Sequence, residues 1–322
     1  MKPVAYLLLA ALLPVSVSQA HVSDVVTLAL IVILFDGGRG MGLSRFRSQA
    51  PAILGLGLLG TFATAALAMV ATHLLLGLSW YLSLLLATAL APTDPAVVFS
   101  LLGKVQGRSA TVLEGESGAN DPVGIALLAA LLGAGSLSGS ALGDAAVDFG
   151  VQLAVGTAIG AAAGLLLRRL PLPSLLAFGV FALADVAHGS GFLAVFVAGI
   201  VAGGSRPHVL DGTIGEAVAF LSLGLLVDLG DLPGVALPAL AIAALLAFVV
   251  RPLVCWPFTL GLARPERTFV LLAGLKGAVP LLLGSMLLDQ DDGHRMFAAT
   301  VVVVLFSIVV QGALVPRLAR RT

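Results

Sequence analysis

Apolar segments of membrane-spanning length follow one another along almost the whole chain, separated by short polar connections. A helix needs about 20 apolar residues to cross a bilayer. The chain is 59% hydrophobic and 11% charged, with a mean hydropathy of +1.10, which is too apolar for a soluble core of this size. We therefore expect an all-α polytopic membrane protein. Its spans are expected near residues 4–20, 22–38, 50–77, 79–102, 109–133, 145–167, 172–188, 190–204, 213–228, 235–262, 268–288 and 294–316.

The basic residues predict how these spans are oriented. Most of the 17 Lys and Arg residues fall in alternate connections, whereas the intervening connections carry aspartates and one basic exception, Arg295. Basic connections face the cytoplasm, so we expect both termini on that side of a bacterial inner membrane if residues 4–20 span it. Residues 1–20 also fit a cleavable signal-like segment, because Lys2 precedes an apolar run that ends in small residues before His21.

Composition and missing motifs argue against several other classes of protein. A net charge of zero argues against a nucleic-acid partner. The single cysteine, Cys255, excludes an internal disulfide and a cysteine metal site. No His-Glu-x-x-His, Gly-x-Ser-x-Gly or cysteine cluster is present, so we expect neither an enzyme nor a bound cofactor.

The run from Glu114 to Pro122 places two carboxylates and an amide in an apolar segment, where ionisable groups mark ion paths. Asp121 precedes a proline, which disfavours helical backbone at that position. We therefore expect an irregular or early-helical site, where its carboxylate can hold a proton or a dehydrated cation. A helix cap at the membrane interface is the alternative. Asn120 can orient a neighbour without adding charge, and Ser117 can offer an oxygen to a cation or bond back to helix carbonyls.

Two other apolar segments are interrupted at one point each. Prolines flank Thr93 and Asp94 near residues 90–96, and two glycines and a proline surround Lys276 near residues 274–280. These patterns predict broken helices, whose unwound backbone is tolerated where it lines a cavity. Where two broken helices cross, an acid and a base can neutralise helix ends of opposite sign.

A buried ion pair is expected between Glu116 and Arg251, which both lie in apolar segments. Each charge would be very costly alone in a bilayer, and a hydrogen-bonded pair limits that cost. Glu114 lies closer to the cytoplasmic connection and is expected at the rim of the cavity.

These residues belong to a set of motifs that resembles one family of transporters. In chain order the motifs are Leu34-Phe35-Asp36-Gly37-Gly38, Thr93-Asp94-Pro95, the run Glu114 to Pro122, Gly189 to Gly199, Arg251-Pro252 and Gly274 to Pro280. From about residue 24 onward, the chain is similar to cation:proton antiporters of the NhaP type. These belong to the monovalent cation:proton antiporter-1 family, and the likeness is to its potassium/proton branch.

The resemblance implies an antiporter fold with two inverted repeats and two crossing broken helices, with residues 21–322 as the exchanger domain. It implies a homodimer whose core moves like an elevator and exchanges one H⁺ for one Na⁺ or K⁺. By the matching motif, Asp121 binds proton and cation in turn, while Thr93 and Ser117 supply oxygens. Asn120, Glu116 and Arg251 would form the supporting network. Asparagine at position 120, in place of a second aspartate, implies electroneutral exchange.

The sequence departs from the family pattern in three ways. The helix count is one short, and residues 4–20 stand where the second helix should be, so the first helix is expected to be missing. Lys276 replaces the arginine more often found in relatives. Because the sequence ends just after Arg321, no cytoplasmic regulatory domain is expected. A transport-deficient or truncated homologue and a passive cation channel are therefore the alternatives, and preference among Na⁺, K⁺ and Li⁺ stays open.

Overall fold

The computed structural model describes residues 2–15, 17–94, 107–170, 173–204 and 212–319, and every regular element within these ranges is helical. In chain order the elements are α1 (Lys2–Ala11), α2 (Gln19–Leu54), the π-helical turn η1 (Gly55–Gly60), α3 (Thr61–Leu76), α4 (Trp80–Ala89), α6 (Arg108–Ala134), α7 (Gly139–Leu167), α8 (Pro173–Val186), α9 (Gly191–Ala202), α10 (Gly212–Gly224), α11 (Leu232–Leu245), η2 (Leu246–Val250), α12 (Arg251–Cys255), η3 (Pro257–Thr259), α13 (Arg264–Leu272), α14 (Ala278–Ser285), α15 (Gly293–Phe306), η4 (Ser307–Gln311) and α16 (Gly312–Ala319).

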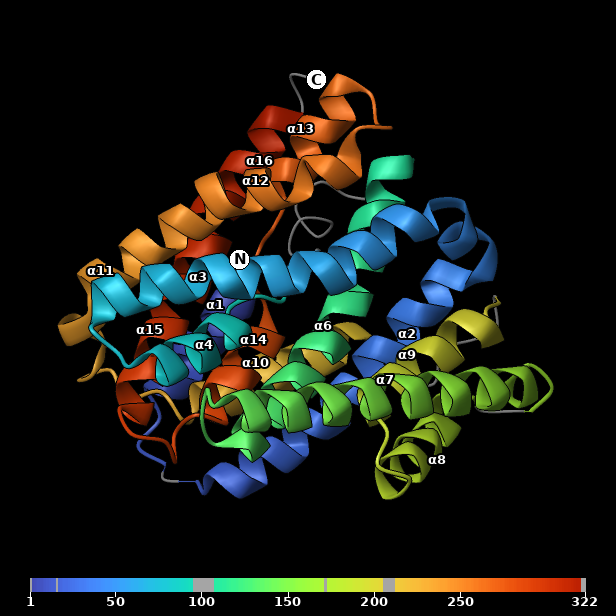
Figure 1. Cartoon of the computed structure of the whole chain (residues 1–322), viewed down its shortest axis with the longest axis horizontal. Helices are drawn as coiled ribbons and strands as arrows, with labels where there is room; N and C mark the ends of the chain where they lie inside the picture. The colour runs from blue at the N-terminus through green and yellow to red at the C-terminus, as the bar shows by residue number, and fades with distance from the viewer. Residues whose placement is uncertain (1, 16, 95–106, 171–172, 205–211, 320–322) are drawn as a thin grey trace.

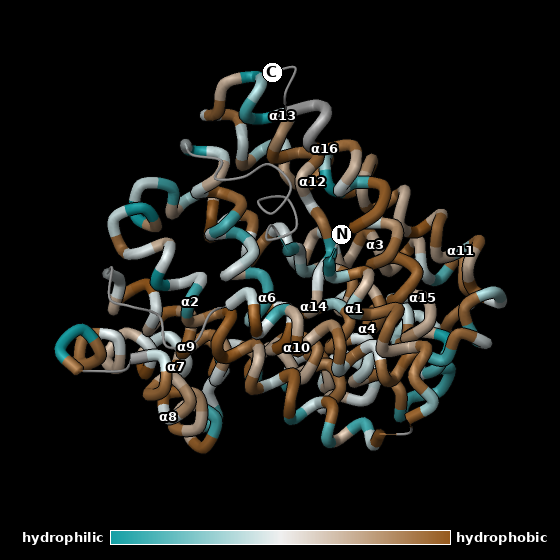
Figure 2. The backbone as a smooth tube through the Cα atoms, turned by 180° about the vertical axis from the view of Figure 1, so that it is seen from behind, coloured by the Kyte–Doolittle hydropathy of each residue, from teal (hydrophilic) through white to brown (hydrophobic). Residues whose placement is uncertain are grey.

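Within the described ranges, five continuous helical stretches are long and apolar enough to cross a membrane: Gln19–Leu76, Arg108–Ala134, Gly139–Leu167, Leu232–Cys255 and Gly293–Val315. Shorter apolar helices fill the space between them. Figure 2 shows that hydrophobic residues dominate most helices and that hydrophilic residues lie mainly at the connections. The expected polytopic helical architecture is therefore confirmed. Pro95 and the rest of the expected span up to residue 102 lie outside the described residues.

The N-terminal helix is shorter than the span expected at residues 4–20. It ends at Ala11, because Pro14 disfavours helical backbone before it and Ser18 starts the next helix by accepting a hydrogen bond from the backbone N of His21. α1 packs against α10, where the carbonyl of Leu7 lies close to Gly224.

The cytoplasmic connection expected after residue 38 is helical instead. α2 continues through it with two kinks, at Gly42 and Gln49. Gly42 has a φ of 64°, a non-helical backbone conformation that favours glycine, so the helix is interrupted there and the chain changes direction. The helical stretch then runs through η1 into α3.

The helices form two bundles that meet along α6 (Figure 1). The first bundle contains α1, the N-terminal part of α2, and α7 to α10. The second bundle contains α3, α4, α6 and α11 to α16. α6 also contacts α2, α7 and α9, and α14 contacts α10, so the two bundles share a continuous interface.

One close crossing in the first bundle joins α2 to α9. Gly38 and Gly199 meet there, and a Cβ added to either glycine would overlap the backbone of the facing helix. Small residues let membrane helices approach this closely, so that dispersion contacts and polar backbone atoms come into range.

Two broken helices cross inside the second bundle. α4 ends at Ala89, and residues up to Asp94 are not helical. The other break separates α13 from α14 at residues 273–277. The backbone N of Asp94 donates to the carbonyl of Leu275 at 2.7 Å, so the two unwound stretches lie against each other.

Adjacent glycines on α2 test the close crossing. We expect Gly38→Ala to lower the free energy of unfolding by about 2 kcal/mol, because an overpacked contact costs on that order. The thermal midpoint in detergent should then fall by roughly 3 °C. Gly37→Ala is the matched control, because a Cβ at Gly37 meets nothing within 4 Å. Equal midpoints for the two variants would show that the α2–α9 crossing tolerates extra volume.

Candidate functional site

Helix α6 presents polar side chains on two neighbouring faces. Glu116 and Asn120 are four residues apart and line one small cavity, whereas Ser117 and Asp121 have the same spacing and line a larger one. All four side chains are buried, with exposed fractions between 2% and 7%. A single helix thus contributes to two adjacent polar cavities.

Asp121 lies in the middle of α6, not in the irregular or early-helical position expected from Pro122. The helix continues through the proline because surrounding helices support it, as is common in membrane proteins. Pro122 has no N–H, so the carbonyl of Gly118 loses its usual helical donor. Gly118 lines the larger cavity together with Asp121.

The larger cavity has a volume of about 370 Å³ and lies between the two bundles. Asp94, Ser117 and Asp121 line it from the second bundle, and α2, α9 and α10 contribute its other side. Oδ1 of Asp121 is buried and has no hydrogen-bond partner among the described residues. An oxygen left in this state is costly unless it meets a proton or a cation.

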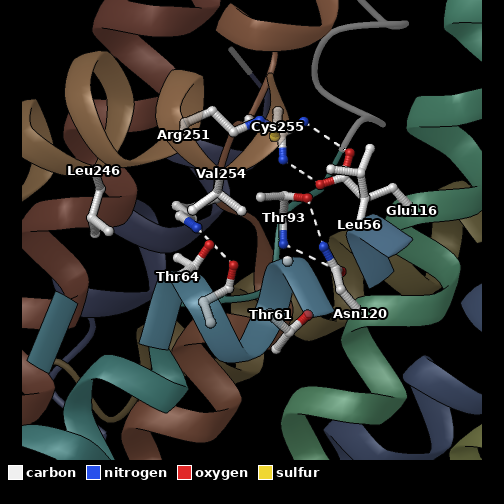
Figure 3. A pocket seen from close by; sticks show the side chains of 14 residues that line it. Leu56, Thr61, Thr64, Thr93, Glu116, Asn120, Leu246, Arg251, Val254 and Cys255 are labelled. Atoms are coloured by element: carbon white, nitrogen blue, oxygen red, sulfur yellow. Dashed lines mark hydrogen bonds and ion pairs between the residues drawn. The ribbon is translucent and has the colours of Figure 1, made fainter. Parts of the chain in front are cut away.

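Thr93 and Asn120 bind each other beside the small cavity. Nδ2 of Asn120 donates to Oγ1 of Thr93 at 2.9 Å, and the backbone N of Thr93 donates to Oδ1 of Asn120 at 3.4 Å (Figure 3). The cavity holds about 20 Å³, room for roughly one water. The structure therefore brings Ser117, Asp121 and Asp94 to one cavity and places Thr93 at the neighbouring one.

Glu116 and Arg251 meet as the sequence led us to expect. The guanidinium donates to both carboxylate oxygens of Glu116, with 2.8 Å between Nη2 and Oε2, and also to the carbonyl of Val270 at 3.2 Å (Figure 3). A Cβ at Gly274 would overlap the Arg251 side chain, so the glycine makes room for it. The pair ties α6 to α12 and to the last turn of α13.

Lys276 and Asp94 lie at the ends of the broken helices. Nζ of Lys276 donates to the carbonyls of Ala91 and Pro92, at 3.0 Å each, just beyond the C-terminus of α4. The Asp94 side chain lies against Gly277, next to the N-terminus of α14. Each charge therefore faces a helix end of opposite partial charge.

Sequence reasoning missed an acid that lines the larger cavity, Glu216 of α10. The signal was available, since Glu216 is an acid within the apolar segment 213–228. Asp36 of α2, noted only as part of a motif, also lines this cavity and accepts a hydrogen bond from the backbone N of Gly212 at 3.4 Å. Glu114, expected at the rim, pairs with Arg45 at 2.7 Å.

Comparison with known proteins agrees with this geometry. The transmembrane sodium/hydrogen exchanger family model matches residues 2–321. The K⁺/H⁺ antiporter NhaP of Alkalimonas amylolytica is 37% identical over 324 residues, which cover 91% of this chain and 56% of the relative. The Na⁺/H⁺ antiporter NhaH of Halobacillus aidingensis is 27% identical over 333 residues, 92% of this chain and 82% of the relative. The chain spans little more than half the length of the potassium/proton relatives.

A solved structure shares the fold. The sodium proton antiporter MjNhaP1 of Methanocaldococcus jannaschii superposes with a TM-score of 0.78, over 97% of this chain and 92% of that one, at 19% identity. The expected antiporter fold is confirmed by this likeness.

The buried ion pair can be tested by a double-mutant cycle. We expect Glu116→Gln and Arg251→Gln each to destabilise the protein by about 3 kcal/mol or more, because each leaves a buried charge without its partner. The double variant should lose less than the sum, with a coupling on the order of a few kcal/mol. Denaturation of the four proteins in detergent measures this coupling.

The pair of Arg45 and Glu114 serves as the control, because its side chains are 41% and 32% exposed. The same cycle there should give a coupling below about 1 kcal/mol. If the effects of the two buried substitutions simply added, the contact between Glu116 and Arg251 would carry no stabilising interaction.

Proposed function

We propose that this chain, which belongs to the sodium/hydrogen exchanger family, exchanges a monovalent cation, Na⁺ or K⁺, for H⁺ across a membrane by alternating access. One observation carries the proposal. A buried carboxylate, that of Asp121, lines a cavity beside two crossing broken helices and has an oxygen with no partner among the described residues. Such a group suits competition between a proton and a dehydrated cation. In this proposal the chain is a transporter and not an enzyme.

Asp121 is the proposed carrier, and its neighbours are proposed to complete the cation site. Ser117 lines the same cavity and offers a hydroxyl oxygen, and the carbonyl of Gly118 lacks its usual helical donor. Asp94 lies at the N-terminus of α14 and lines the same cavity as the Asp121 carboxylate. Thr93 would act from the neighbouring cavity, where Asn120 orients it.

Alternating access is proposed to move the second bundle against the first. Asn120 binds Thr93 and Glu116 binds Arg251, so α6 is tied to the second bundle by buried polar contacts. The larger cavity lies at the interface with α2, α9 and α10, where relative movement would open it first to one side and then to the other.

The membrane location, the orientation and the oligomeric state are proposed from the pattern of basic residues and from the family. The apolar helices belong in a lipid bilayer, with the C-terminus on the cytoplasmic side of a bacterial inner membrane. Residues 21–322 are proposed as the exchanger domain, working as a homodimer with no cofactor. The transported Na⁺ or K⁺ and H⁺ are its only proposed small partners, and it has no nucleic-acid role.

Substitution of the carrier tests the proposal. We expect Asp121→Asn to reduce exchange to the level of empty liposomes while expression and thermal midpoint stay near wild type, since no buried partner is orphaned. Cation-induced dequenching of a pH dye in proteoliposomes, run with Na⁺, K⁺ and Li⁺, measures this. Asp144→Asn, which replaces an exposed acid of α7, should leave exchange at the wild-type rate. Wild-type rates in the Asp121 variant would refute the carrier role.

Stoichiometry gives a second test. One carrier carboxylate has the same net charge whether it holds H⁺ or a monovalent cation, and Asn120 cannot titrate. Exchange should be one for one and insensitive to membrane potential, which contributes roughly 2.3 kcal/mol per charge per 100 mV. Rates of Na⁺/H⁺ exchange at potentials set by valinomycin and K⁺ should therefore coincide. Cation flux without counter-movement of H⁺ would instead indicate a passive channel, and no flux at all a transport-deficient homologue.

A further inference from the structure

A carboxylate outside the second bundle faces the larger cavity. Glu216 lies in the second turn of α10, is partly buried, and lines the cavity that holds Asp94, Ser117 and Asp121. An acid inside an apolar helix at membrane depth is costly, so a functional role is the default expectation. The exchange proposed above gives Glu216 no part.

The other acids of this cavity have structural tasks. Asp36 accepts the hydrogen bond from the first residue of α10, Asp94 lies at the N-terminus of α14, and Glu114 pairs with Arg45. Within the described ranges, Glu216 makes neither a hydrogen bond nor an ion pair. Its charge is therefore available to an ion that enters.

Acidic residues outnumber basic ones in the lining of this cavity. Glu216 interacts electrostatically with Asp94, and Asp94 with Asp121, so three carboxyl groups act on the same space. Asp121 is only 7% exposed, and its Oδ1 has no partner among the described residues. Arg45 is the one basic residue that lines this cavity among the described residues, and it pairs with Glu114. A cavity with such an excess of acids raises the local concentration of cations.

Glu216 and Asp121 lie on different bundles. α10 packs mainly against α1 and α2, whereas α6 is tied to the second bundle by its bonds to Thr93 and Arg251. A carboxylate that stays with the first bundle does not travel with the carrier. It cannot bring a proton across, but it can attract the cation whenever Asp121 faces it.

We propose that Glu216 is a stationary docking carboxylate that concentrates the alkali cation in the larger cavity and sets the apparent KM, without entering the exchange stoichiometry. This inference rests on the proposed antiport function, and it names a residue that determines cation affinity.

Kinetics in proteoliposomes test the docking role. For Glu216→Gln we expect the KM for Na⁺ and K⁺ to rise about tenfold, on the order expected for one charge lost from such a cavity, with the maximal rate within about twofold of wild type. Glu216→Asp should restore most of the affinity, because it keeps the charge. Asp148→Asn on α7, an exposed acid outside the cavity, should leave KM unchanged. If the Gln variant does not fold, Glu216→Ala compared with Glu216→Asp gives the same test.

A null-point measurement separates docking from proton carriage. The cation gradient that just balances an imposed pH gradient should be the same for wild type and Glu216→Gln. A shifted null point would overturn the inference, because it would show that Glu216 changes its proton occupancy during the cycle. An unchanged KM would overturn it as well.

Binding can be measured apart from transport. The Na⁺ concentration that half-maximally raises the thermal midpoint in detergent should increase about tenfold in Glu216→Gln, in line with the change in KM. If wild type binds Na⁺ in this assay but exchanges nothing, the antiport function fails while docking is still tested. Equal Na⁺ dependence in wild type and variant would reject the docking role alone.

Discussion

Unwound backbone inside a membrane must find its hydrogen-bond partners within the protein, because lipid offers none. Here the partners are the two broken helices themselves. Lys276 donates to two carbonyls beyond the end of α4, and the N–H of Asp94 donates to Leu275 in the other break. The crossing therefore satisfies groups that neither helix could satisfy alone, and it holds Asp94 and Lys276 at the ends that they neutralise.

Helix α6 adds a second layer of constraint to this crossing. Its Asn120 binds the first break through Thr93, and its Glu116 binds Arg251, which in turn packs on Gly274 of the second break. The side chains of Glu116 and Asn120 on this face of the helix are therefore committed to structure. The next face carries Asp121 with an unpartnered oxygen among the described residues, and this carboxylate is the carrier that we propose.

The two walls of the larger cavity are held together by different kinds of contact. One wall belongs to α6 and α14, which the buried polar contacts join into one unit. The other belongs to α2, α9 and α10, whose packing depends on the close approach of Gly38 and Gly199. Acids on both walls therefore share one space while belonging to the two bundles that we propose to move against each other. That division gives Asp121 and Glu216 different proposed roles.

The sequence by itself determined the helical membrane architecture, the two breaks and the acids at membrane depth, because hydropathy, proline and glycine act locally along the chain. It also indicated the partnership of Glu116 and Arg251, since each buried charge needs another. Only the tertiary structure decided that Thr93 and Asp121 line different cavities, that α6 passes through Pro122 unbroken, and that Glu216 faces Asp121's cavity. These depend on which face of each helix meets its neighbour, and long-range packing sets that choice.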